Sequence, residues 1–358
     1  MSDLPPLISV IIPAYNGERT ILRTLLSIVR QIYRPLQLIV VDDTSKDSTG
    51  SLVEDFMKKN CSLDEFKLLR HNKNLGLSRS LNDGILDARG DFILILHQDC
   101  ELIRDDWIEK ALAIMEDERV AVVTGYYGIH DVEDESFVKR AFGILRKQFH
   151  SCPKVTCEEV TFSEGKCDLY RRSLLLKIEG FPTNYRIAGE DLMVSYKLRK
   201  LGYKIVKCYD LPVVQRFSGT AESFWGNMKK EFLFGKAMGG VFSEFKFYLF
   251  KGVRVSRYSG SRSLHRASQP VFVLALIGFA VSIFLFAWWF VYFLFGLLLV
   301  RYLYYVFRVF AELKVYMNRV SYPLMELVTM ALIGILSDFA YSLGFGYGLI
   351  RYSLGKRL

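Results

Sequence analysis

From residue 7 to residue 128, apolar segments typical of strands alternate with amphipathic segments typical of helices. Strands that are apolar on both faces and separated by helices form a mainly parallel sheet with helices on both faces. The alternation therefore predicts an α/β fold, and 358 residues are enough for a sizeable core. The strands are expected at 7–15, 35–43, 66–72, 91–97 and 120–128, and the helices at 17–31, 48–60, 78–89 and 105–117.

The pattern loosens after Gly128. Residues 129–165 are expected to form loop and short helix that cover a bound substrate. Two helices are expected at 170–181 and 189–204, followed by a strand at 205–215. These elements complete a predicted first domain of residues 1–220.

Two long apolar blocks follow. Residues 271–300 contain no charged side chain, whereas roughly 20 apolar residues are enough to cross a bilayer. Because so long a helix would exceed the hydrocarbon thickness, we expect a hairpin at about 271–310. The second block, 323–350, either re-enters and returns or crosses once. A transmembrane region over 269–358 is therefore expected, with a buried core helix as the alternative for each block.

The positive charge is concentrated just before these blocks. Of the net charge of +9, residues 201–268 contribute +8, from 12 Lys or Arg and 4 Asp or Glu. Aromatic and basic residues alternate over 221–268, which is typical of amphipathic helices in a membrane interface with anionic lipids. An ordinary amphipathic helix on the globular domain is the alternative. No nucleic-acid motif accompanies the charge, so nucleic acid is not an expected partner.

Compartment is predicted from the same features. No signal sequence precedes the first strand, and basic residues beside a membrane segment favour the cytoplasmic side. We therefore expect a multi-pass protein of the cell membrane whose catalytic domain lies in the cytoplasm. The six cysteines have no zinc-binding spacing, and all six are expected to be reduced thiols, in agreement with that compartment.

Polar residues follow three of the predicted strands. The segment "PAYNGE" (13–18) follows the first strand, Asp42 and Asp43 end the second, and "HQD" (97–99) ends the fourth. Each motif alone is also common in turns. The carboxyl ends of neighbouring parallel strands border one crevice, where ligands bind in open α/β sheets. The sequence therefore predicts a ligand site at this edge.

Five segments occur in an order and spacing that resemble a known family. They are "SVIIPAYNGERTI", "LIVVDDTSKDST", "NKNLGLSRSLNDGI", "LILHQD" and "GEDLMVSYKLRKLGYK". Over about residues 7–240 the chain resembles the family 2 inverting glycosyltransferases, which have the GT-A fold. The membrane tail is similar to that of relatives that act on lipid-linked or secreted glycans.

The resemblance implies a nucleotide-sugar donor, a UDP- or GDP-sugar. It assigns the base and ribose to Pro13, Ala14, Tyr15, Glu18 and Asp43. A carboxylate can accept the N3–H of uracil or the ribose hydroxyls, and Tyr15 can offer its ring face. Asp42 is a further candidate, with a turn-capping role as the alternative. Asn82 is assigned with the donor as well, although Leu81 replaces an Arg that many relatives have before it.

The "HQD" segment matches the Asp-X-Asp motif of the family, with Asp99 as the second Asp and His97 in place of the first. A divalent cation on Asp99 would offset the charge of the departing diphosphate, and Mg²⁺ or Mn²⁺ is implied. His97 is either a ligand, which suits Mn²⁺ better, or a hydrogen-bond partner of ribose or phosphate. Gln98 is assigned to the donor.

Asp191 begins a predicted helix in "GED" (189–191), and the resemblance makes it the general base that deprotonates the acceptor. Capping of the helix is the structural alternative. With a polyprenyl phosphate as acceptor, a base is superfluous, and Asp191 would then position the acceptor or the metal ion.

These features predict a metal-dependent inverting enzyme that moves one sugar to a lipid-linked polyprenyl acceptor or glycan. The segment "VVQRFSGT" lacks the Gln-X-X-Arg-Trp signature of processive synthases, and Arg216 and Lys229 are candidates to meet a lipid phosphate. A polyprenyl-phosphate glycosyl synthase is the second hypothesis, and a non-catalytic membrane scaffold the third. A dinucleotide-dependent oxidoreductase is disfavoured, because no Gly-X-Gly-X-X-Gly follows the first strand.

Overall fold

The computed structural model describes residues 5–59, 65–129, 156–183, 189–216, 223–245, 292–307 (apart from 294 and 298) and 324–354. The chain divides into two compact units. The first contains the described residues up to 216, and the second contains those from 223 onward.

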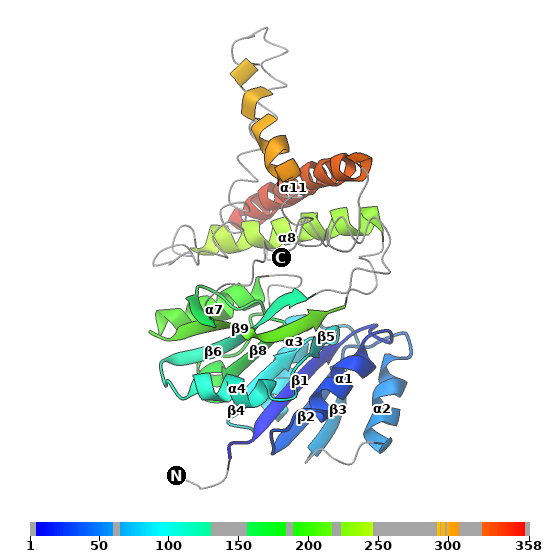
Figure 1. Cartoon of the computed structure of the whole chain (residues 1–358), viewed down its shortest axis with the longest axis vertical. Helices are drawn as coiled ribbons and strands as arrows, with labels where there is room; N and C mark the ends of the chain where they lie inside the picture. The colour runs from blue at the N-terminus through cyan, green and yellow to red at the C-terminus, as the bar shows by residue number, and fades with distance from the viewer. Residues whose placement is uncertain are drawn as a thin grey trace. The chain divides into compact units, whose positions relative to one another are not determined.

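The first unit follows the predicted alternation of strands and helices (Figure 1). Its strands are β1 (Ile8–Ala14), β2 (Leu36–Asp42), β3 (Glu65–Arg70), β4 (Phe92–Leu96), β5 (Cys100–Leu102), β6 (Val120–Ile129), β7 (Cys157–Val160), β8 (Cys167–Arg171) and β9 (Lys204–Gln215). Its helices are α1 (Ile21–Val29), α2 (Thr49–Lys59), α3 (Leu77–Asp87), α4 (Trp107–Met115), α6 (Arg172–Lys177) and α7 (Glu190–Lys200).

The described strands form one nine-stranded sheet in the order β3-β2-β1-β4-β8-β6-β9-β5, with β7 paired to β9. Strands β3, β2, β1 and β4 are parallel to one another. Strand β8 runs antiparallel to both of its neighbours, β4 and β6, so the sheet as a whole is mixed. The α/β architecture is confirmed, and its parallel half lies on the β3 side.

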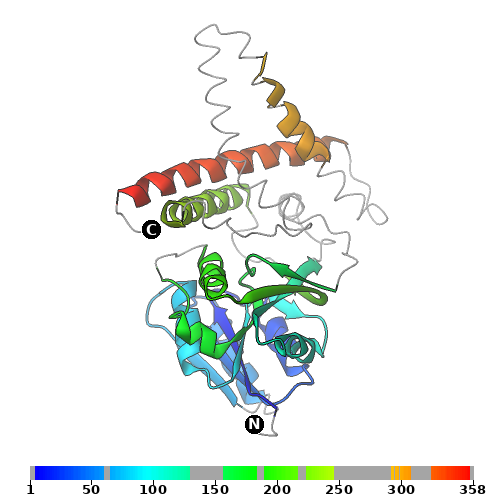
Figure 2. The same ribbon diagram turned by 90° about the vertical axis from the view of Figure 1, so that its left-hand side faces the viewer.

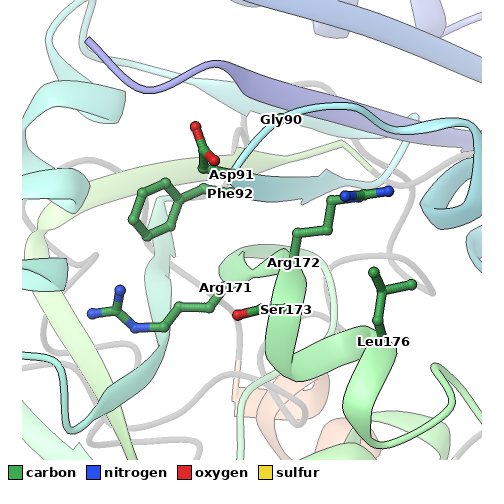
Figure 3. Close-up of a pocket in the computed structure, with 7 residues that line it drawn as sticks. All are labelled: Gly90, Asp91, Phe92, Arg171, Arg172, Ser173 and Leu176. Carbon is green, nitrogen blue, oxygen red and sulfur yellow. The ribbon is translucent and has the colours of Figure 1, made fainter. Parts of the chain in front are cut away.

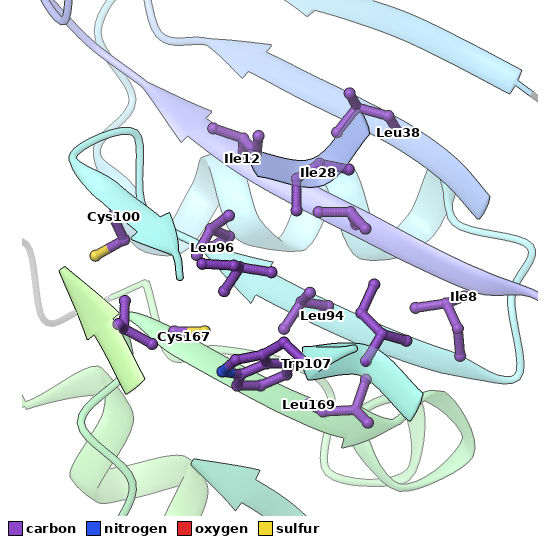
Figure 4. Close-up of a cluster of buried hydrophobic side chains, with 14 of the residues drawn as sticks. Ile8, Ile12, Ile28, Leu38, Leu94, Leu96, Cys100, Trp107, Cys167 and Leu169 are labelled. Atoms are coloured by element: carbon purple, nitrogen blue, oxygen red, sulfur yellow. The ribbon is translucent and has the colours of Figure 1, made fainter. Parts of the chain in front are cut away.

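Side chains of each central strand alternate between two cores. In β1, Val10 and Ile12 lie in the first core, whereas Ile11 lies in the second. Helices α1, α2 and α4 cover the first core, where Trp107 is fully buried (Figure 4). Helices α3, α6 and α7 cover the second. Burial on both faces explains why these strands are continuously apolar in sequence.

Three short strands depart from the prediction. Strand β5 follows the "HQD" segment directly, and β7 lies within 129–165, where loop and short helix were expected. Strand β8 takes the first two residues of the helix expected at 170–181, so that α6 begins only at Arg172. Each of these strands has at most five residues and is stabilised by pairing with distant strands, which a local pattern does not reveal.

The expectation of six reduced thiols is wrong for two of the cysteines. Cys157 of β7 and Cys208 of β9 are directly opposite in the antiparallel register and form a disulfide, with their Cα atoms 4.2 Å apart. Opposed positions of neighbouring strands bring Cβ atoms within disulfide range. Cys100 and Cys167 are buried free thiols. Cysteine usage therefore no longer supports a reducing compartment.

The second unit contains helices α8 (Phe224–Phe245) and α11 (Leu324–Ser353), together with a helical segment at 292–307. Within α11, Val328–Tyr352 is the one described helix that is long and apolar enough to be a candidate membrane span. Because α11 is continuous, the re-entrant alternative for 323–350 is wrong. Residues 246–291 and 308–323, with most of the expected hairpin, lie outside the described residues.

Helices α8 and α11 lie side by side in both views and approach at their backbones (Figure 2). A Cβ on Gly235 of α8 would collide with the carbonyl oxygen of Tyr341, and a Cβ on Gly344 of α11 would collide with that of Phe232. Gly239 and Gly348 make the same kind of contact one turn further on. The two Gly-X-X-X-Gly patterns thus allow a close helix pair, of the kind known from membrane helices. Helix α8, predicted to lie in the interface, is therefore a packing partner of α11.

Candidate active site

Five strand ends meet at one edge of the sheet. Strands β1, β2 and β4 end there with their carboxyl termini, because they are parallel. The antiparallel β8 begins there, and the backbone N–H of His97 donates to the carbonyl of Lys166 at 2.8 Å. Strand β9 ends there too, since Gln215 pairs with Cys100 of β5. The three predicted tip motifs therefore lie together, as the parallel order requires.

Hydrogen bonds join the loop after β1 to the loop after β2. The backbone N–H of Asn16 donates to Ser45 Oγ at 3.0 Å, and that of Glu18 donates to Asp47 Oδ2 at 3.1 Å. In return, the Glu18 carboxylate accepts a 3.0 Å hydrogen bond from the N–H of Ser48, just before α2. Glu18, which was predicted to bind the nucleotide-sugar, thus connects the loop after β1 to the loop after β2.

Tyr15 is held by its backbone and leaves its ring accessible. Its N–H donates to Gln98 Oε1 and its carbonyl accepts from Gln98 Nε2, both at 2.9 Å. Tyr15 is 43% exposed. Pro13 and Ala14 are buried within β1. Gln98 therefore fixes the start of the loop that presents Tyr15.

The two acids that end β2 are both buried and hydrogen-bonded to protein. Asp43 accepts from the N–H groups of Leu75 and Gly76 at 2.7 and 2.8 Å, and its Oδ1 lies 2.8 Å from His71 Nδ1. Asp42 Oδ1 accepts from the N–H of Ser45 at 2.9 Å. Asp43 thus shapes the loop that precedes α3, and Asp42 shapes its own turn.

Asn82 of α3 forms a reciprocal pair of hydrogen bonds with the backbone of Phe181. Its Nδ2 donates to the carbonyl and its Oδ1 accepts from the N–H, both at 2.7 Å. Asn82 therefore connects the segment that follows α6 to α3.

Asp99 is held by an amide bridge. Gln215 Nε2 donates to Asp99 Oδ2 at 2.9 Å, and Gln215 Oε1 accepts from Lys166 Nζ at 2.9 Å. Asp99, Lys166 and the neighbouring His97 are partly exposed. Sequence reasoning missed both Gln215 and Lys166. The signal was a polar Gln at the end of the strand predicted at 205–215.

The side chains at this edge that could be metal ligands fit a cation whose remaining ligands come from the substrate. No group of three or more His, Cys, Asp and Glu side chains among the described residues is arranged to hold a metal ion. The carboxylate of Asp99, which is oriented by Gln215, would be one ligand. Mg²⁺ is commonly bound by one or two carboxylates plus substrate phosphates, so Asp99 with a diphosphate is a sufficient set.

Asp191 lies in the first turn of α7, after Gly189 at φ 103°. It faces the turn before β8, where Gly165 adopts φ +71°, and a Cβ on Gly165 would lie 2.9 Å from that of Asp191. Burial raises the pKa of Asp191, with a smaller contribution in the same direction from Asp168, whereas Lys166 lowers it. A raised carboxyl pKa suits a general base.

Two buried acids, Asp168 and Glu190, influence the pKa of Asp191 or are influenced by its charge. Burial raises the pKa of Asp168 to about 6, although Asp168 Oδ2 accepts from the N–H of Gly165 at 2.9 Å and from the hydroxyl of Tyr170 at 3.0 Å. Burial, and then the charge of Asp191, raise the pKa of Glu190. The resemblance-based assignment did not include these acids.

A separate surface hollow of about 350 Å³ lies where β4 begins and β8 ends (Figure 3). It is lined by Gly90, Asp91, Phe92, Arg171, Arg172, Ser173 and Leu176. Arg171 is occupied structurally, because its guanidinium donates to the carbonyls of Val120, Met115 and Asp117 around the end of α4. None of the predicted site residues lines this hollow.

Known proteins agree with this fold and these motifs. Residues 9–178 match the model "Glycosyl transferase family 2". The O-antigen chain rhamnosyltransferase RfbN of Salmonella typhimurium is 32% identical over 212 residues, which are 58% of this chain and 65% of that protein. The glycosyltransferase GlyG of Streptococcus pneumoniae is 29% identical over 131 residues, 37% of this chain and 42% of that protein. The chain thus matches only part of the length of these relatives.

Solved structures share the architecture. The mannosyltransferase PcManGT from Pyrobaculum calidifontis, solved with GDP-Man and Mn²⁺, has a TM-score of 0.56 at 18% identity, over 99% of this chain and 88% of that one. GalNAc-T7, solved with UDP, GalNAc and Mn²⁺, has a TM-score of 0.51 at 16% identity, over 70% of this chain and 50% of that one. With the family match and the strand-tip motifs, this likeness confirms the GT-A fold, and residues 9–178 are a family 2 glycosyltransferase domain.

Proposed function

We propose that this glycosyltransferase moves one sugar, with inversion, from a nucleotide-sugar to a lipid-linked polyprenyl acceptor or glycan. The reaction takes place at the cytoplasmic face of the cell membrane and depends on a divalent cation. The observation that carries the proposal is the pair of carboxylates at one sheet edge, an oriented Asp99 and a half-buried Asp191. Lys166 is hydrogen-bonded to Gln215, which orients Asp99, and its charge lowers the pKa of Asp191.

On the donor side, Tyr15 offers its exposed ring to the base of a UDP- or GDP-sugar. The other donor residues act mainly through the loops that they order: Pro13, Ala14, Glu18, Asp42, Asp43, Asn82 and Gln98. A cation bound by Asp99, with or without His97, supplies positive charge to the diphosphate. The two solved structures described above, which hold a nucleotide ligand and Mn²⁺, support this assignment.

On the acceptor side, Asp191 takes the proton of an acceptor hydroxyl. The acceptor oxygen attacks the anomeric carbon from the face opposite the nucleotide, and the bond to the diphosphate oxygen breaks with its electron pair. Configuration at the anomeric carbon is thereby inverted. The raised pKa of Asp191 supports this role, because it makes the carboxylate a stronger base than an exposed aspartate.

A membrane-embedded acceptor is supported by three features of the second unit and the sequence before it. These are the candidate span in α11, the uncharged stretch 271–300 and the basic region 201–268. The two apolar blocks support a multi-pass topology, and the basic residues beside them support a cytoplasmic orientation of the catalytic domain. Lys229 is exposed on α8 and is available to a lipid phosphate or headgroup, whereas Arg216 Nε lies 3.3 Å from Glu101.

The test uses membranes that contain the full chain. They are incubated with a panel of labelled nucleotide-sugars and Mn²⁺ or Mg²⁺, and lipids are then extracted with organic solvent. We expect label from one donor to move into the lipid fraction, and EDTA to stop the transfer. Asp99→Asn and Asp191→Asn should each lower the rate by at least about 100-fold. Asp55→Asn, on the exposed face of α2, is the matched control and should transfer normally.

Two results would contradict the proposal. Label that moves only into water-soluble products would exclude a lipid-linked acceptor. Full transfer by the Asp99→Asn and Asp191→Asn variants would exclude the catalytic assignment. The same extraction with added polyprenyl phosphate distinguishes the bare lipid phosphate from a lipid-linked glycan as acceptor.

A further inference from the structure

Lys166 lies at the centre of the site edge, although neither its sequence context nor the family motifs draw attention to it. It directly precedes β8, and the register that pairs Leu96 with Cys167 places it opposite His97. The 2.8 Å hydrogen bond from the His97 N–H to the Lys166 carbonyl fixes this position. The backbone of Lys166 is thus hydrogen-bonded to the 97–99 segment, which contains Asp99.

The ammonium group of Lys166 is linked through one side chain, Gln215, to the carboxylate that is proposed to hold the cation. Its Nζ donates to Gln215 Oε1 at 2.9 Å, and Gln215 in turn donates to Asp99. The positive charge of Lys166 also lowers the pKa of Asp191. Lys166 remains partly exposed, so that solvent or a ligand can reach it.

The charge balance of this edge gives the lysine a chemical purpose. His97 stands where the resemblance expects a first carboxylate, so one negative charge is missing from the cation site. A cation held by Asp99 alone is held more weakly than by two carboxylates, while the diphosphate leaving group still needs neutralisation. A lysine supplies positive charge without a metal ligand set, as lysines do at many phosphate sites.

We propose that Lys166 is a phosphate-binding residue, whose ammonium contacts the diphosphate of the donor and shares its neutralisation with the cation at Asp99. This inference rests on the proposed nucleotide-sugar donor and adds to it a second, metal-independent source of positive charge. Gln215 serves both sources, because it holds Lys166 with its oxygen and Asp99 with its amide nitrogen.

A metal-independent contact predicts a specific binding behaviour. Without a divalent cation, the protein should still prefer a nucleoside diphosphate to the corresponding monophosphate, because the lysine reaches the phosphate that only the diphosphate has. Removal of the ammonium should abolish that preference while leaving the base and ribose contacts intact.

The experiment measures equilibrium binding of UDP, UMP, GDP and GMP to the full chain in detergent, in EDTA and in Mn²⁺. For Lys166→Met we expect about a 10- to 100-fold loss of affinity for the preferred diphosphate in EDTA, as for other hydrogen bonds to charged groups, and less than about threefold for the monophosphate. Lys166→Arg should retain most of the affinity. Lys58→Met, on the exposed face of α2, is the matched control and should bind as the wild type does.

Each contrary outcome has its own meaning. If Lys166→Met binds the diphosphate like the wild type in EDTA and loses affinity only in Mn²⁺, the lysine acts through the cation site, and the inference is overturned. Equal losses for diphosphate and monophosphate would also overturn it, since they indicate a structural role. If the wild type binds none of the four nucleotides, the proposed function itself fails. Far-UV circular dichroism of each variant, with recovery in Lys166→Arg, excludes misfolding as the cause.

Discussion

The side-chain amide of Gln215 donates a 2.9 Å hydrogen bond to Asp99 Oδ2, across the antiparallel pair that β5 forms with β9. Only the thiol of Cys100, at 3.7 Å, is a hydrogen-bond partner of the other oxygen, Oδ1, among the contacts of the described residues. The bond therefore holds the Asp99 carboxylate through one oxygen, Oδ2. Groups that orient a metal-binding carboxylate contribute strongly to metal affinity.

Gln215→Leu is expected to weaken the cation site. The variant loses both the hydrogen bond to Asp99 and the bond from Lys166, so the carboxylate is no longer held in one orientation. We expect about a 10- to 100-fold increase in the Mn²⁺ concentration needed for half-maximal transfer. Gln215→Glu should show the same change, because it replaces the amide donor by an acceptor. An unchanged Mn²⁺ titration in both variants would show that the amide bridge has no part in cation binding.

The pH dependence of transfer should report the ionisation of Asp191. A general base must be deprotonated, so kcat/KM rises with pH through its pKa and levels off above it. Because burial raises that pKa, the rise should occur above the ordinary aspartate pKa of 3.8. The Asp191→Asn variant should lose activity at all pH values. A pH-independent residual activity close to that of the wild type would instead favour an acceptor that is already anionic, such as a polyprenyl phosphate.

Asp168 should make stability depend on pH in the opposite direction from an ordinary aspartate. Its folded-state pKa of about 6 exceeds the ordinary aspartate pKa of 3.8, so the native state binds the proton more tightly than the unfolded state. Stability from this group is complete below pH 4 and is lost as the pH rises through 6, by about 3 kcal/mol in all. Asp168→Asn removes this dependence. Thermal unfolding of both proteins in detergent between pH 4 and 7 should show the wild type losing stability relative to the variant.

The central strands could be predicted because they are buried on both faces and their sequences are therefore continuously apolar. β1, β2 and β4 lie within the ranges expected from the sequence, and β3 begins one residue before its expected range. The common location of the three tip motifs could be predicted as well, because the carboxyl ends of parallel strands lie at one edge of the sheet. The short β7 and β8 could not be predicted, because their pairing partners lie far away in the chain.

The candidate site was predictable as a location, but its hydrogen bonds were not. The Asp43 carboxylate accepts hydrogen bonds from the N–H groups of Leu75 and Gly76. These bonds depend on how the loop before α3 folds over β2. The link from Gln215 to Lys166 depends on the antiparallel strands beside β4. A local sequence pattern shows where a strand ends. It does not show these hydrogen bonds, because their partners are far apart in the chain and become neighbours only through the order of the strands in the sheet.

The close approach of α8 and α11 can be tested with two glycines of one helix. Gly344 faces the backbone of Phe232, whereas a Cβ on Gly346 would meet nothing within 4 Å. Gly344→Leu should therefore separate the helices and destabilise the second unit by at least 1–3 kcal/mol, the usual range for overpacking. Gly346→Leu is the matched control and should gain slightly from helix propensity. The measurement is the thermal unfolding midpoint in detergent, and equal midpoints for the two variants would contradict the packing.

The ion pair between Arg301 and Asp338 should stabilise the second unit only as a pair. Arg301 Nε and a terminal nitrogen lie 2.9 and 2.7 Å from Asp338 Oδ2, and Asp338 is fully buried in α11. Removal of one partner leaves a buried charge, and so Asp338→Leu and Arg301→Met should each cost about 3–5 kcal/mol. The double variant should recover most of that loss, because apolar side chains of similar size replace both charges. A double-mutant cycle on the unfolding midpoint measures the coupling, and simple addition of the two losses would show that the charges act independently.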